Sequence, residues 1–422
     1  MKEKALPEGW VETTLADVVK IVRGVSYKKE QSSNEPLENY LPILRASNIK
    51  DEYLNFDELV YVQSELIKAE QKIKKNDVLV AMSSGSKLVV GKTARAEQNI
   101  EMGFGVFCAI LRPNTDIEPK LVSQFTQSAY YRSEISRLSA GGTINNLKPA
   151  YFKEIIFPLP PLETQQKLAK KFTALLSQVA EIKQRLEKIP ALLKTYRQSV
   201  LARAVNGELS AKWREENGVS LESWAISTLK NLTTKIGSGS TPKGAEYLPE
   251  GVPFIRSLNI YTHFIKFDDL AFINDEQAQK LKNVVIEQGD LLLNITGASI
   301  GRVNIAPKEF IGGRVNQHVA IIRSKLDKIR PHFLHIFFAS PKIQKWINDE
   351  NYGSTRQALT KGMLEELKIA VPSLEEQNYI TQAVEKHLNF ANQLEARVNA
   401  ALERINLMTQ AILAKGFRGE LL

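Results

Sequence analysis

The longest regular hydrophobic pattern in the chain lies within residues 160–209. Its apolar positions recur in alternating steps of four and three, which is typical of the seam of a coiled coil and predicts one long helix. A second segment of this kind, at residues 372–421, predicts another long helix. Two seams in one chain favour helices that close on each other, with helices of an ordinary bundle as the alternative. The seam positions are Leu168, Phe172, Leu175, Val179, Ile182, Leu186 and Ile189 in the first segment, and Ile380, Val384, Leu388, Ala391, Leu394, Val398, Leu402, Ile405, Met408 and Ile412 in the second.

The two helical segments are copies of one another. The first begins with PPLETQ at residues 160–165 and ends with NGEL at 206–209, and the second begins with PSLEEQ at 372–377 and ends with RGEL at 418–421. Matched positions lie 212 residues apart at both ends, so neither copy has gained or lost a residue. We expect the polar residues of each entry to satisfy N–H groups of the first helical turn, and the glycine to end the helix.

Pro190 interrupts the first seam. A proline inside a helix removes a backbone hydrogen bond and crowds the carbonyl group four residues earlier, here that of Leu186. Beyond it, Leu193, Tyr196 and Val200 continue the same spacing. We therefore expect either a kink, or a break and restart, with both parts facing one partner.

The segments before the two helices are also related to each other. Residues 42–49 correspond to 253–260, residues 76–82 to 289–295 and residues 142–147 to 354–359. The 76–82 and 289–295 pair predicts a turn that leads into a strand buried on both faces. Further short strands are predicted at 105–111 and 319–323, and helices at 126–138 and 331–348. Matched positions drift between 210 and 214 residues apart, which indicates insertions in surface loops.

These patterns predict an α+β fold in which two similar mixed α/β domains are separated by two long helices. If the two helices pair as an antiparallel coiled coil, the repeat has pseudo-twofold symmetry. The predicted boundaries are residues 1–157 for the first domain, 158–212 for the first helix region, 213–369 for the second domain and 370–422 for the second helix region.

Composition and charge narrow the class of protein. The 422 residues carry a formal net charge of +9, which is compatible with a polyanionic partner such as nucleic acid. A single cysteine, Cys108, excludes an internal disulfide framework. No signal-peptide core or membrane-length apolar run is present, so we expect a cytoplasmic protein with no membrane partner.

Motifs of catalysis and metal binding are not found. The run GSKLVVGKT at 85–93 is similar to a phosphate-binding loop, but Ser86 stands where that loop needs its first glycine, so we interpret it as a structural turn. The histidines are scattered, and only His332 and His335 share helical spacing, without further ligands at metal spacing. The sequence predicts no catalytic residue, no metal site and no cofactor in this chain.

Two basic domains held apart by a pair of long helices suit the recognition of two separate patches of a DNA duplex. Lysine and arginine bind phosphates, arginine reads guanine, and asparagine or glutamine reads adenine. About 42 residues of helix span about 63 Å, which is on the order of one to two turns of DNA. The stretch of DNA between the two half-sites would then go unread.

The whole chain resembles the specificity subunits of type I restriction-modification systems. The resemblance rests on the paired helix entries and endings and on AKWR at 211–214 after the first ending. The first domain, with LPEGW at 6–10, RGVSYKK at 23–29 and MSSGS at 82–86, is similar to target-recognition domains of the enteric branch of that family.

This resemblance implies two target-recognition domains that each read one half of a split, asymmetric sequence in double-stranded DNA. It also implies an antiparallel helix pair that docks two methyltransferase subunits and, through them, two restriction subunits. S-adenosylmethionine, ATP and Mg²⁺ are then expected on those partners, and this chain is expected to be non-catalytic.

Candidate DNA-binding residues are polar or basic side chains in loops beside a glycine or in a repeated turn. They are Arg23, Tyr27, Lys28, Lys29, Ser84, Lys87, Asn145 and Asn146 in the first domain, and Ser240, Thr241, Lys243, Arg314, Asn316, Gln317, Arg356 and Gln357 in the second.

Two other classes of function stay open on the sequence alone. One is a coiled-coil scaffold whose domains bind proteins, and the other is an ATP-using enzyme built on residues 85–93.

Overall fold

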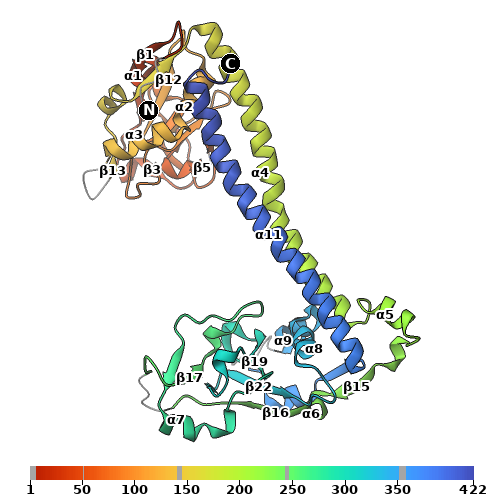
Figure 1. Cartoon of the computed structure of the whole chain (residues 1–422). Helices are drawn as coiled ribbons and strands as arrows, with labels where there is room; N and C mark the ends of the chain where they lie inside the picture. Colours follow the sequence, from red (N-terminus) through yellow and green to blue (C-terminus); the bar gives the residue numbers. More distant parts are fainter. Residues whose placement is uncertain (1–5, 51, 140–144, 243–246, 351–357) are drawn as a thin grey trace. The chain divides into compact units, whose positions relative to one another are not determined.

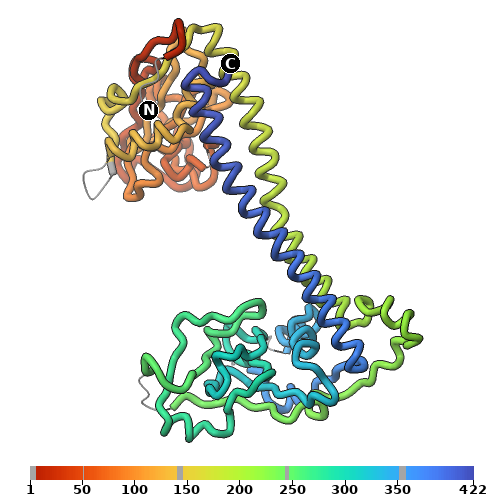
Figure 2. Tube along the Cα trace, in the orientation of Figure 1, coloured from red at the N-terminus to blue at the C-terminus, as the bar shows by residue number. Residues whose placement is uncertain are grey.

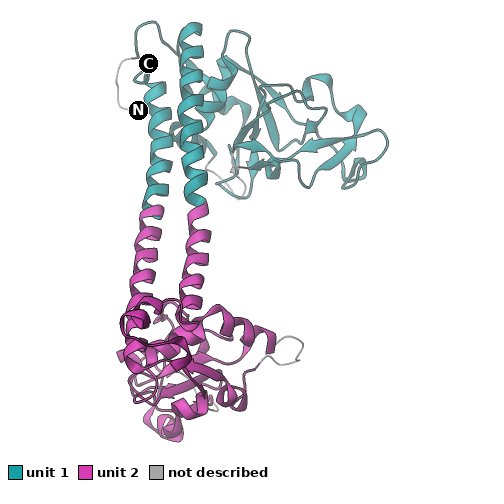
Figure 3. Ribbon diagram, turned by 90° about the vertical axis from the view of Figure 1, so that its right-hand side faces the viewer, with its two compact units in different colours: residues 1–187, 399–422 teal, residues 188–398 magenta. Residues whose placement is uncertain are grey.

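The chain packs as two compact units. A computed structural model describes residues 6–50, 52–139, 145–242, 247–350 and 358–422. Unit 1 consists of residues 1–187 and 399–422, and unit 2 consists of residues 188–398 (Figure 3). Two 44-residue helices, α4 (Leu162–Val205) and α11 (Leu374–Phe417), each contribute one part to each unit (Figure 1). The first described residues and the last residues of the chain both belong to unit 1 (Figure 2).

Unit 1 contains the first domain, in which short strands outnumber helices. Its helices are α1 (Leu15–Val18), α2 (Pro119–Thr126) and α3 (Ala129–Ser139). Its strands are β1 (Val11–Thr14), β2 (Val19–Arg23), β3 (Ser32–Ser33), β4 (Tyr40–Leu44), β5 (Ile49–Lys50), β6 (Tyr53–Leu54), β7 (Val60–Gln63), β8 (Val78–Ala81), β9 (Ser83–Ser84), β10 (Thr93–Arg95), β11 (Gly103–Phe104), β12 (Cys108–Pro113), β13 (Asn145–Asn146) and β14 (Ile156–Leu159).

Unit 2 contains the second domain, which repeats the same order of elements with small differences. Its helices are α5 (Ala211–Glu216), α6 (Leu229–Leu232), α7 (Asp275–Lys280), α8 (Pro331–Ala339), α9 (Pro341–Glu350) and α10 (Lys361–Glu366). Its strands are β15 (Ala225–Thr228), β16 (Thr233–Ser238), β17 (Val252–Ile255), β18 (Ala271–Ile273), β19 (Leu291–Asn294), β20 (Val303–Ile305), β21 (Arg314–Val315), β22 (Val319–Ser324) and β23 (Lys368–Val371).

The central sheet has the same topology in both domains. In the first domain the strand order is β10, β8, β12 and β2, and in the second it is β20, β19, β22 and β16. β12 runs antiparallel to both β8 and β2, and β22 runs antiparallel to both β19 and β16. The ends of β2 and β8 therefore meet the start of β12 at one edge of the sheet, and the ends of β16 and β19 meet the start of β22 in the same way.

A buried ion pair also occurs in both domains. The Arg112 guanidinium donates from Nε and one Nη to the two carboxylate oxygens of Asp77, at 2.7 Å each. Arg323 donates to Asp290 in the same two-pronged manner, at 2.8 Å each. The carboxylate side chains are 1% and 0% exposed, so each pair fixes the turn before the buried strand in the same way.

The structure confirms the predicted helices and strands by type and changes the bounds of several of them. β8 and β19 are buried along their whole length, as the sequence indicates. The strand predicted at 105–111 is wrong at its start, because residues 105–107 form a turn before β12. The helix predicted at 126–138 corresponds to α3 and shares only Thr126 with α2, from which Ser128 separates it, and the helix predicted at 331–348 is divided into α8 and α9 at Ser340. In each domain a serine at the division, Ser128 or Ser340, bonds through its hydroxyl group to a carbonyl three residues back, which competes with the helical pattern.

Each long helix is tied to its own domain by a buried glutamine near its start. Gln165 donates to the Pro160 carbonyl and accepts from the N–H of Glu118, the residue before α2. Gln377 donates to the Pro372 carbonyl and accepts from the N–H of Arg330, the residue before α8. The prediction that this glutamine serves the first helical turn is therefore wrong. Because the preceding segment turns back on itself, the side chain instead reaches a carbonyl outside the helix and an N–H group of the domain.

In unit 1, the start of α4 packs against the end of α11. The rings of Phe172 and Phe417 lie 5.3 Å apart, and Phe417 also lies 5.2 Å from Phe125 in the core of the first domain. A Cβ atom at Gly416 would lie 2.1 Å from the Phe172 ring, so only glycine allows this approach. The end of α11 is therefore part of the core of the first domain.

In unit 2, the end of α4 packs against the start of α11. The hydroxyl group of Tyr196 lies 2.6 Å from Nδ1 of His387, and Arg197 forms an ion pair with Glu395 at 2.7 Å. Val200 and Val384 belong to one buried cluster with the core of the second domain. In each unit the start of one helix meets the end of the other, which confirms antiparallel pairing.

The seam is confirmed at most positions, with three corrections. Ile182 and Met408 are each 51% exposed, because one partner helix covers a side chain from a single direction. Near the end of α11, Leu413 is fully buried whereas Ile412 is only partly buried. A straight helix drifts relative to a strict 3.5-residue repeat, which moves the buried position by one residue.

The third correction concerns Pro190. Helix α4 continues through this proline, so the alternative of a break and restart is wrong.

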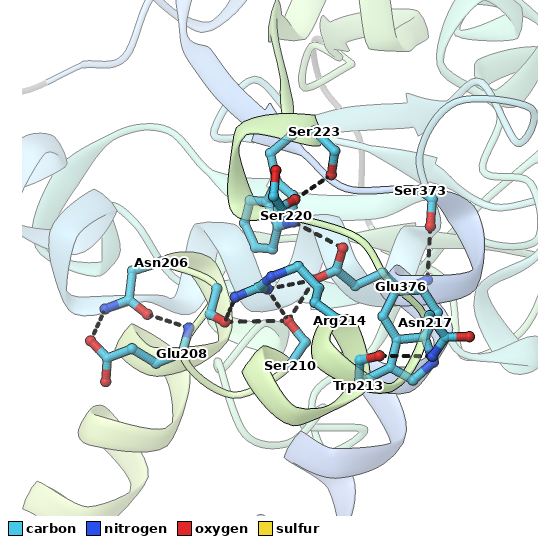
Figure 4. Close-up of polar contacts among 12 residues, drawn as sticks. Asn206, Glu208, Ser210, Trp213, Arg214, Asn217, Ser220, Ser223, Ser373 and Glu376 are labelled. Atoms are coloured by element: carbon cyan, nitrogen blue, oxygen red, sulfur yellow. Dashed lines mark hydrogen bonds and ion pairs between the residues drawn. The ribbon is translucent and has the colours of Figure 1, made fainter.

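The junction between α4 and the second domain contains a buried network of charged groups (Figure 4). Arg214 of α5 donates to the Glu376 carboxylate at 2.7 Å and to the Gly207 carbonyl at 2.7 Å. Ser210 donates to the same carboxylate, and the indole N–H of Trp224 donates to its second oxygen at 2.9 Å. The Arg214 and Glu376 side chains are 9% and 1% exposed. The network joins the end of α4, the start of α11 and the start of the second domain.

We predict that Arg214→Met destabilises unit 2 strongly. Removing one partner of a buried pair leaves an uncompensated charge and costs about 3–5 kcal/mol. Urea unfolding followed by tryptophan fluorescence measures the loss.

The matched control is Arg203→Met, which removes the exposed ion pair between Arg203 and Glu208. Exposed pairs contribute about 0–1 kcal/mol, so this variant should unfold close to the parent. Equal losses in the two variants would show that the buried network does not stabilise the junction.

Candidate nucleic-acid interface

The candidate site of the first domain is the edge of the central sheet where β2 and β8 end. The turn 105–107, just before β12, lies at the same edge, since N–H groups of Met82 and Ser83 donate to the Phe107 carbonyl at 2.8 and 3.3 Å. β13 joins from far along the chain by pairing with β9, so that Asn145 faces Ser84 and Asn146 faces Ser83. Segments that are distant in sequence therefore meet at one edge.

The structure brings most sequence-predicted residues of the first domain toward this edge. Arg23 is the last residue of β2, and Lys28 and Lys29 follow it on an exposed segment. Lys87 is exposed in the loop after β9, and Asn146 is exposed on β13. Tyr27 and Ser84 are partly buried, and the Ser84 hydroxyl group accepts from the N–H of Ser86 at 3.2 Å. The exposed cations give this edge the charge that phosphate contacts require.

The second domain forms the corresponding edge from the ends of β16 and β19 and the start of β22. The N–H of Ile295 donates to the His318 carbonyl at 3.0 Å, and the N–H of Leu359 donates to the Ile295 carbonyl at 2.8 Å. Thr296 pairs with Ala358 as an isolated bridge, which matches the pairing of β9 with β13 in the first domain. Lys243, Arg356 and Gln357, also predicted here, lie outside the described residues.

A chain of hydrogen bonds links the polar side chains of this edge. The Thr241 hydroxyl group donates to Oε1 of Gln317 at 2.5 Å, and Nε2 of Gln317 donates to Nε2 of His318 at 3.0 Å. Nδ1 of His318 in turn contacts the Thr296 hydroxyl group. Because Nε2 of His318 accepts in this arrangement, a neutral ring carries its proton on Nδ1 and donates it to Thr296. Thr241 and Gln317 are therefore brought together, and Ser240 lies exposed beside Thr241.

Two predicted residues of the second domain have geometry that favours a structural role. Arg314 donates to the carbonyl groups of Ala278, Gly312 and Gly313, and burial lowers the pKa of its guanidinium. Asn316 is 6% exposed and accepts from the N–H of His318 at 3.0 Å. Their assignment to DNA binding stays a prediction, and the donors of Arg314 are largely used within the domain.

The sequence analysis did not select several residues at or near these edges. In the second domain, a hollow of about 380 Å³ is lined by Tyr261, Thr296, Arg302 and His318 among others. The Arg302 guanidinium lies 4.3 Å from the centre of the Tyr261 ring, which stacks on Phe264 at 4.3 Å. The choice of glycine-flanked polar loops overlooked this stack. The available signal was Arg302 itself, a basic residue that directly follows Gly301.

The structure supports the sequence-based interpretation of residues 85–93 as a turn. This segment leads into strand β10, whereas a phosphate-binding loop leads into a helix. The Thr93 hydroxyl group donates to Thr126 and is buried, so it does not face a ligand. Burial raises the pKa of the Cys108 thiol to about 12, which leaves it protonated and unreactive.

Histidines and carboxylates do not form a metal site within the described ranges. No group of three or more His, Cys, Asp or Glu side chains there has the geometry to hold a metal ion. His335 lies on α8, and burial lowers its pKa to about 4, so it is neutral at physiological pH. His387 contacts Tyr196 in the helix pair. Within the same described ranges, no helix combines the length and apolar character that a bilayer crossing needs.

With this geometry established, comparison with known proteins identifies the class. The family description "Type I restriction modification DNA specificity domain" matches residues 7–191 and 222–404, once for each domain with the larger part of its following helix. The chain therefore belongs to the family of type I restriction-modification specificity subunits, which are the DNA sequence-recognition subunits of these systems.

Individual relatives cover the chain from end to end. It is 37% identical to the Type I restriction enzyme EcoKI specificity subunit of Escherichia coli K12, over 100% of this chain and 91% of that protein. It is 36% identical to the StySPI specificity subunit of Salmonella potsdam, with the same coverage.

Solved structures show the same fold at low sequence identity. A chain from a study of assembly and conformational transition of the type I R-M system aligns with a TM-score of 0.75 at 19% identity, over 99% of this chain and 100% of that one. The HsdS subunit of Thermoanaerobacter tengcongensis aligns with a TM-score of 0.60 at 20% identity, over 99% of each chain. These likenesses confirm the predicted fold of two domains with a coiled-coil linker.

We predict that Arg314→Ala and Gln317→Ala separate folding from DNA reading. Arg314→Ala removes the side-chain hydrogen bonds to three carbonyl groups and should lower the free energy of unfolding by about 1–3 kcal/mol. Gln317→Ala changes an exposed side chain and should alter stability by less than about 0.5 kcal/mol, while it relaxes discrimination at one base pair by about 1–3 kcal/mol.

Urea unfolding and DNA binding to matched and mismatched sites give the two measurements. Strong destabilisation by Gln317→Ala would contradict its role in DNA reading. Unchanged stability in Arg314→Ala would contradict its structural role.

Proposed function

We propose that the chain reads a split, asymmetric DNA target, with one half-site for each domain. The observation that supports this most directly is the sheet edge described above, which each domain builds from the same loops. In both domains the edge carries exposed basic or hydrogen-bonding side chains that fit phosphates and base edges. The loops of the two domains differ in sequence, so two different half-sites are expected.

The proposal assigns chemistry to partner subunits. Two methyltransferase subunits would dock on the helix pair, and two restriction subunits would join through them. S-adenosylmethionine, ATP and Mg²⁺ would be bound by those partners, with no cofactor and no catalytic residue in this chain. Adenine must leave the base stack to be methylated, so the role of this chain is to determine which adenines its partners reach. Such a complex acts on cellular DNA, which places it in the cytoplasm.

The lengths of the long helices support a further part of the proposal. Both helices have 44 residues, and their copies match without insertion or deletion. In contrast, the domain loops differ in length between the copies. A helix pair of fixed length fits the task of setting the unread gap between two half-sites.

We predict that exchanging residues 1–157 for the first domain of another specificity subunit changes only one half-site. The complex of the chain with its methyltransferase is expressed in cells, and modified adenines are mapped across the genome. The first half-site should change completely, while the second half-site and the gap should stay the same. The absence of a bipartite motif in the parent complex would contradict the proposed function.

We predict that inserting four residues near the start of α11 changes the gap and neither half-site. Four residues add about one helical turn, or about 6 Å. The insert carries an apolar residue where the three-and-four spacing requires one. The same genome-wide map of methylated adenines measures the result.

Its control replaces four residues at the same point with the inserted sequence, which leaves the helix length unchanged. An altered gap in the control, or an altered half-site in the insertion variant, would exclude the helices as the element that sets the gap.

A further inference from the structure

At one structurally equivalent turn, the first domain has apolar side chains and the second domain has polar side chains. Turn 105–107 precedes β12 and turn 316–318 precedes β22, and both make the same backbone contacts. The Phe107 carbonyl accepts from the N–H of Met82, and the His318 carbonyl accepts from the N–H of Ile295. On the other side, the N–H of Gly105 donates to the Leu44 carbonyl at 2.8 Å, and the N–H of Asn316 donates to the Ile255 carbonyl at 3.1 Å. Val106 therefore corresponds to Gln317, and Phe107 corresponds to His318.

In the second domain this turn presents groups that form hydrogen bonds. Gln317 and His318 belong to the chain that runs from Thr241 to Thr296. If Nδ1 of His318 donates to Thr296, the hydroxyl hydrogen of Thr296 is left to donate into the hollow that both residues line. A polar edge of a base fits such a donor.

In the first domain the same turn presents two adjacent apolar side chains to solvent. Phe107 is 65% exposed and Val106 is 42% exposed. Burying an apolar side chain of this size is worth roughly 1.5–3 kcal/mol, so leaving both in water forgoes a substantial gain. Arg23 pairs with Ala109, two residues after Phe107, and Lys87 lies four residues after Ser83, whose N–H donates to the Phe107 carbonyl. Both cations are exposed, so the apolar turn belongs to an edge that also carries basic side chains.

The charge around these side chains selects their partner. A basic rim with an apolar centre does not suit an apolar protein surface, but it matches a DNA groove, where phosphates flank the bases. The apolar group that a base presents in the major groove is the C5-methyl group of thymine. Side chains at the tip of a turn are placed to reach it.

We propose that Phe107 and Val106 are specificity-determining residues of the first domain that contact the C5-methyl group of a thymine in the first half-site. This inference rests on the proposed function and assigns to the two domains different modes of reading. The first domain uses apolar contact at this turn, and the second domain uses hydrogen bonds.

The test removes only the methyl group from the DNA. Methylation mapping of the complex with its methyltransferase first defines the two half-sites. Each thymine of the first half-site is then replaced in turn by uracil, which keeps every hydrogen-bonding group. At one or two positions the affinity should fall about fourfold, which corresponds to the loss of one buried methyl group.

The variants Phe107→Ala and Val106→Ala should bind thymine and uracil DNA with nearly equal affinity at that position. Leu37→Ala is the matched control, because Leu37 is 52% exposed before the start of β4, at the opposite end of that strand from Gly105. It should keep the full difference between thymine and uracil. Having two independent variants at exposed positions guards against loss of folding in one of them.

The outcomes separate this inference from the proposed function. The inference is wrong if the first half-site contains no thymine, or if none of its thymines responds to methyl removal. It is also wrong if both alanine variants respond like the parent. In each of these cases the proposed function is unaffected, because the bipartite motif is still observed. If the alanine variants instead fail to assemble with the methyltransferase, the turn is a protein contact and the inference is also wrong. Absence of a bipartite motif would overturn the proposed function itself.

Discussion

The structure depends on how each long helix is joined to the domain before it. Gln165 and Gln377 are buried, and each binds one carbonyl of the proline turn and the N–H of the residue preceding a domain helix. A side-chain amide that uses both its donor and its acceptor in this way fixes direction as well as position. Replacing it would leave a buried N–H and a buried carbonyl unpaired. Within each unit, the start of the helix is therefore fixed to its domain. The sheet edge that we propose reads DNA, called the reading edge below, then has a fixed orientation relative to the helix axis in that unit.

This joint explains why helix length is preserved while loop lengths drift. A residue added inside a helix rotates everything beyond it by about 100°, whereas a residue added in a surface loop leaves the sheet and the joint unchanged. The ion pairs Arg112–Asp77 and Arg323–Asp290 fix the turns before the buried strands β8 and β19. Between these fixed points, turns such as 105–107 and 316–318 can carry unrelated side chains on the same backbone.

Sequence reasoning predicted the features that periodicity or repetition encodes. Long helices and the buried strands β8 and β19 follow from apolar spacing, which reports burial directly, whereas antiparallel pairing followed from the resemblance to the family. It failed where a single side chain overrides a pattern. Ser128 and Ser340 divide expected helices by capturing carbonyl groups, and the entry glutamines bind the domain instead of the helix. For the reading edge, residue type was a poor guide in both directions, since polar Arg314 is used within the fold while apolar Phe107 stands exposed. Aligning the two copies position by position would have drawn attention to Phe107, because its counterpart follows the selected Gln317.

The two copies also show that symmetric geometry does not need symmetric chemistry. At the end of α4, Arg214, Ser210 and Trp224 converge on Glu376 at the start of α11. The position that matches Glu376 in the first copy is Thr164, which has no charge to receive an arginine. Each junction also contains a close approach at a matching glycine, since a Cβ atom would lie 2.4 Å from Leu221 at Gly207 and 2.2 Å from Pro7 at Gly419. The junction after α4 adds a buried ion pair to this close approach, and both junctions place a helix end against the start of a domain. The repeat therefore preserves where the elements meet and leaves the means of contact free to diverge, which is the same freedom that lets the two reading edges differ.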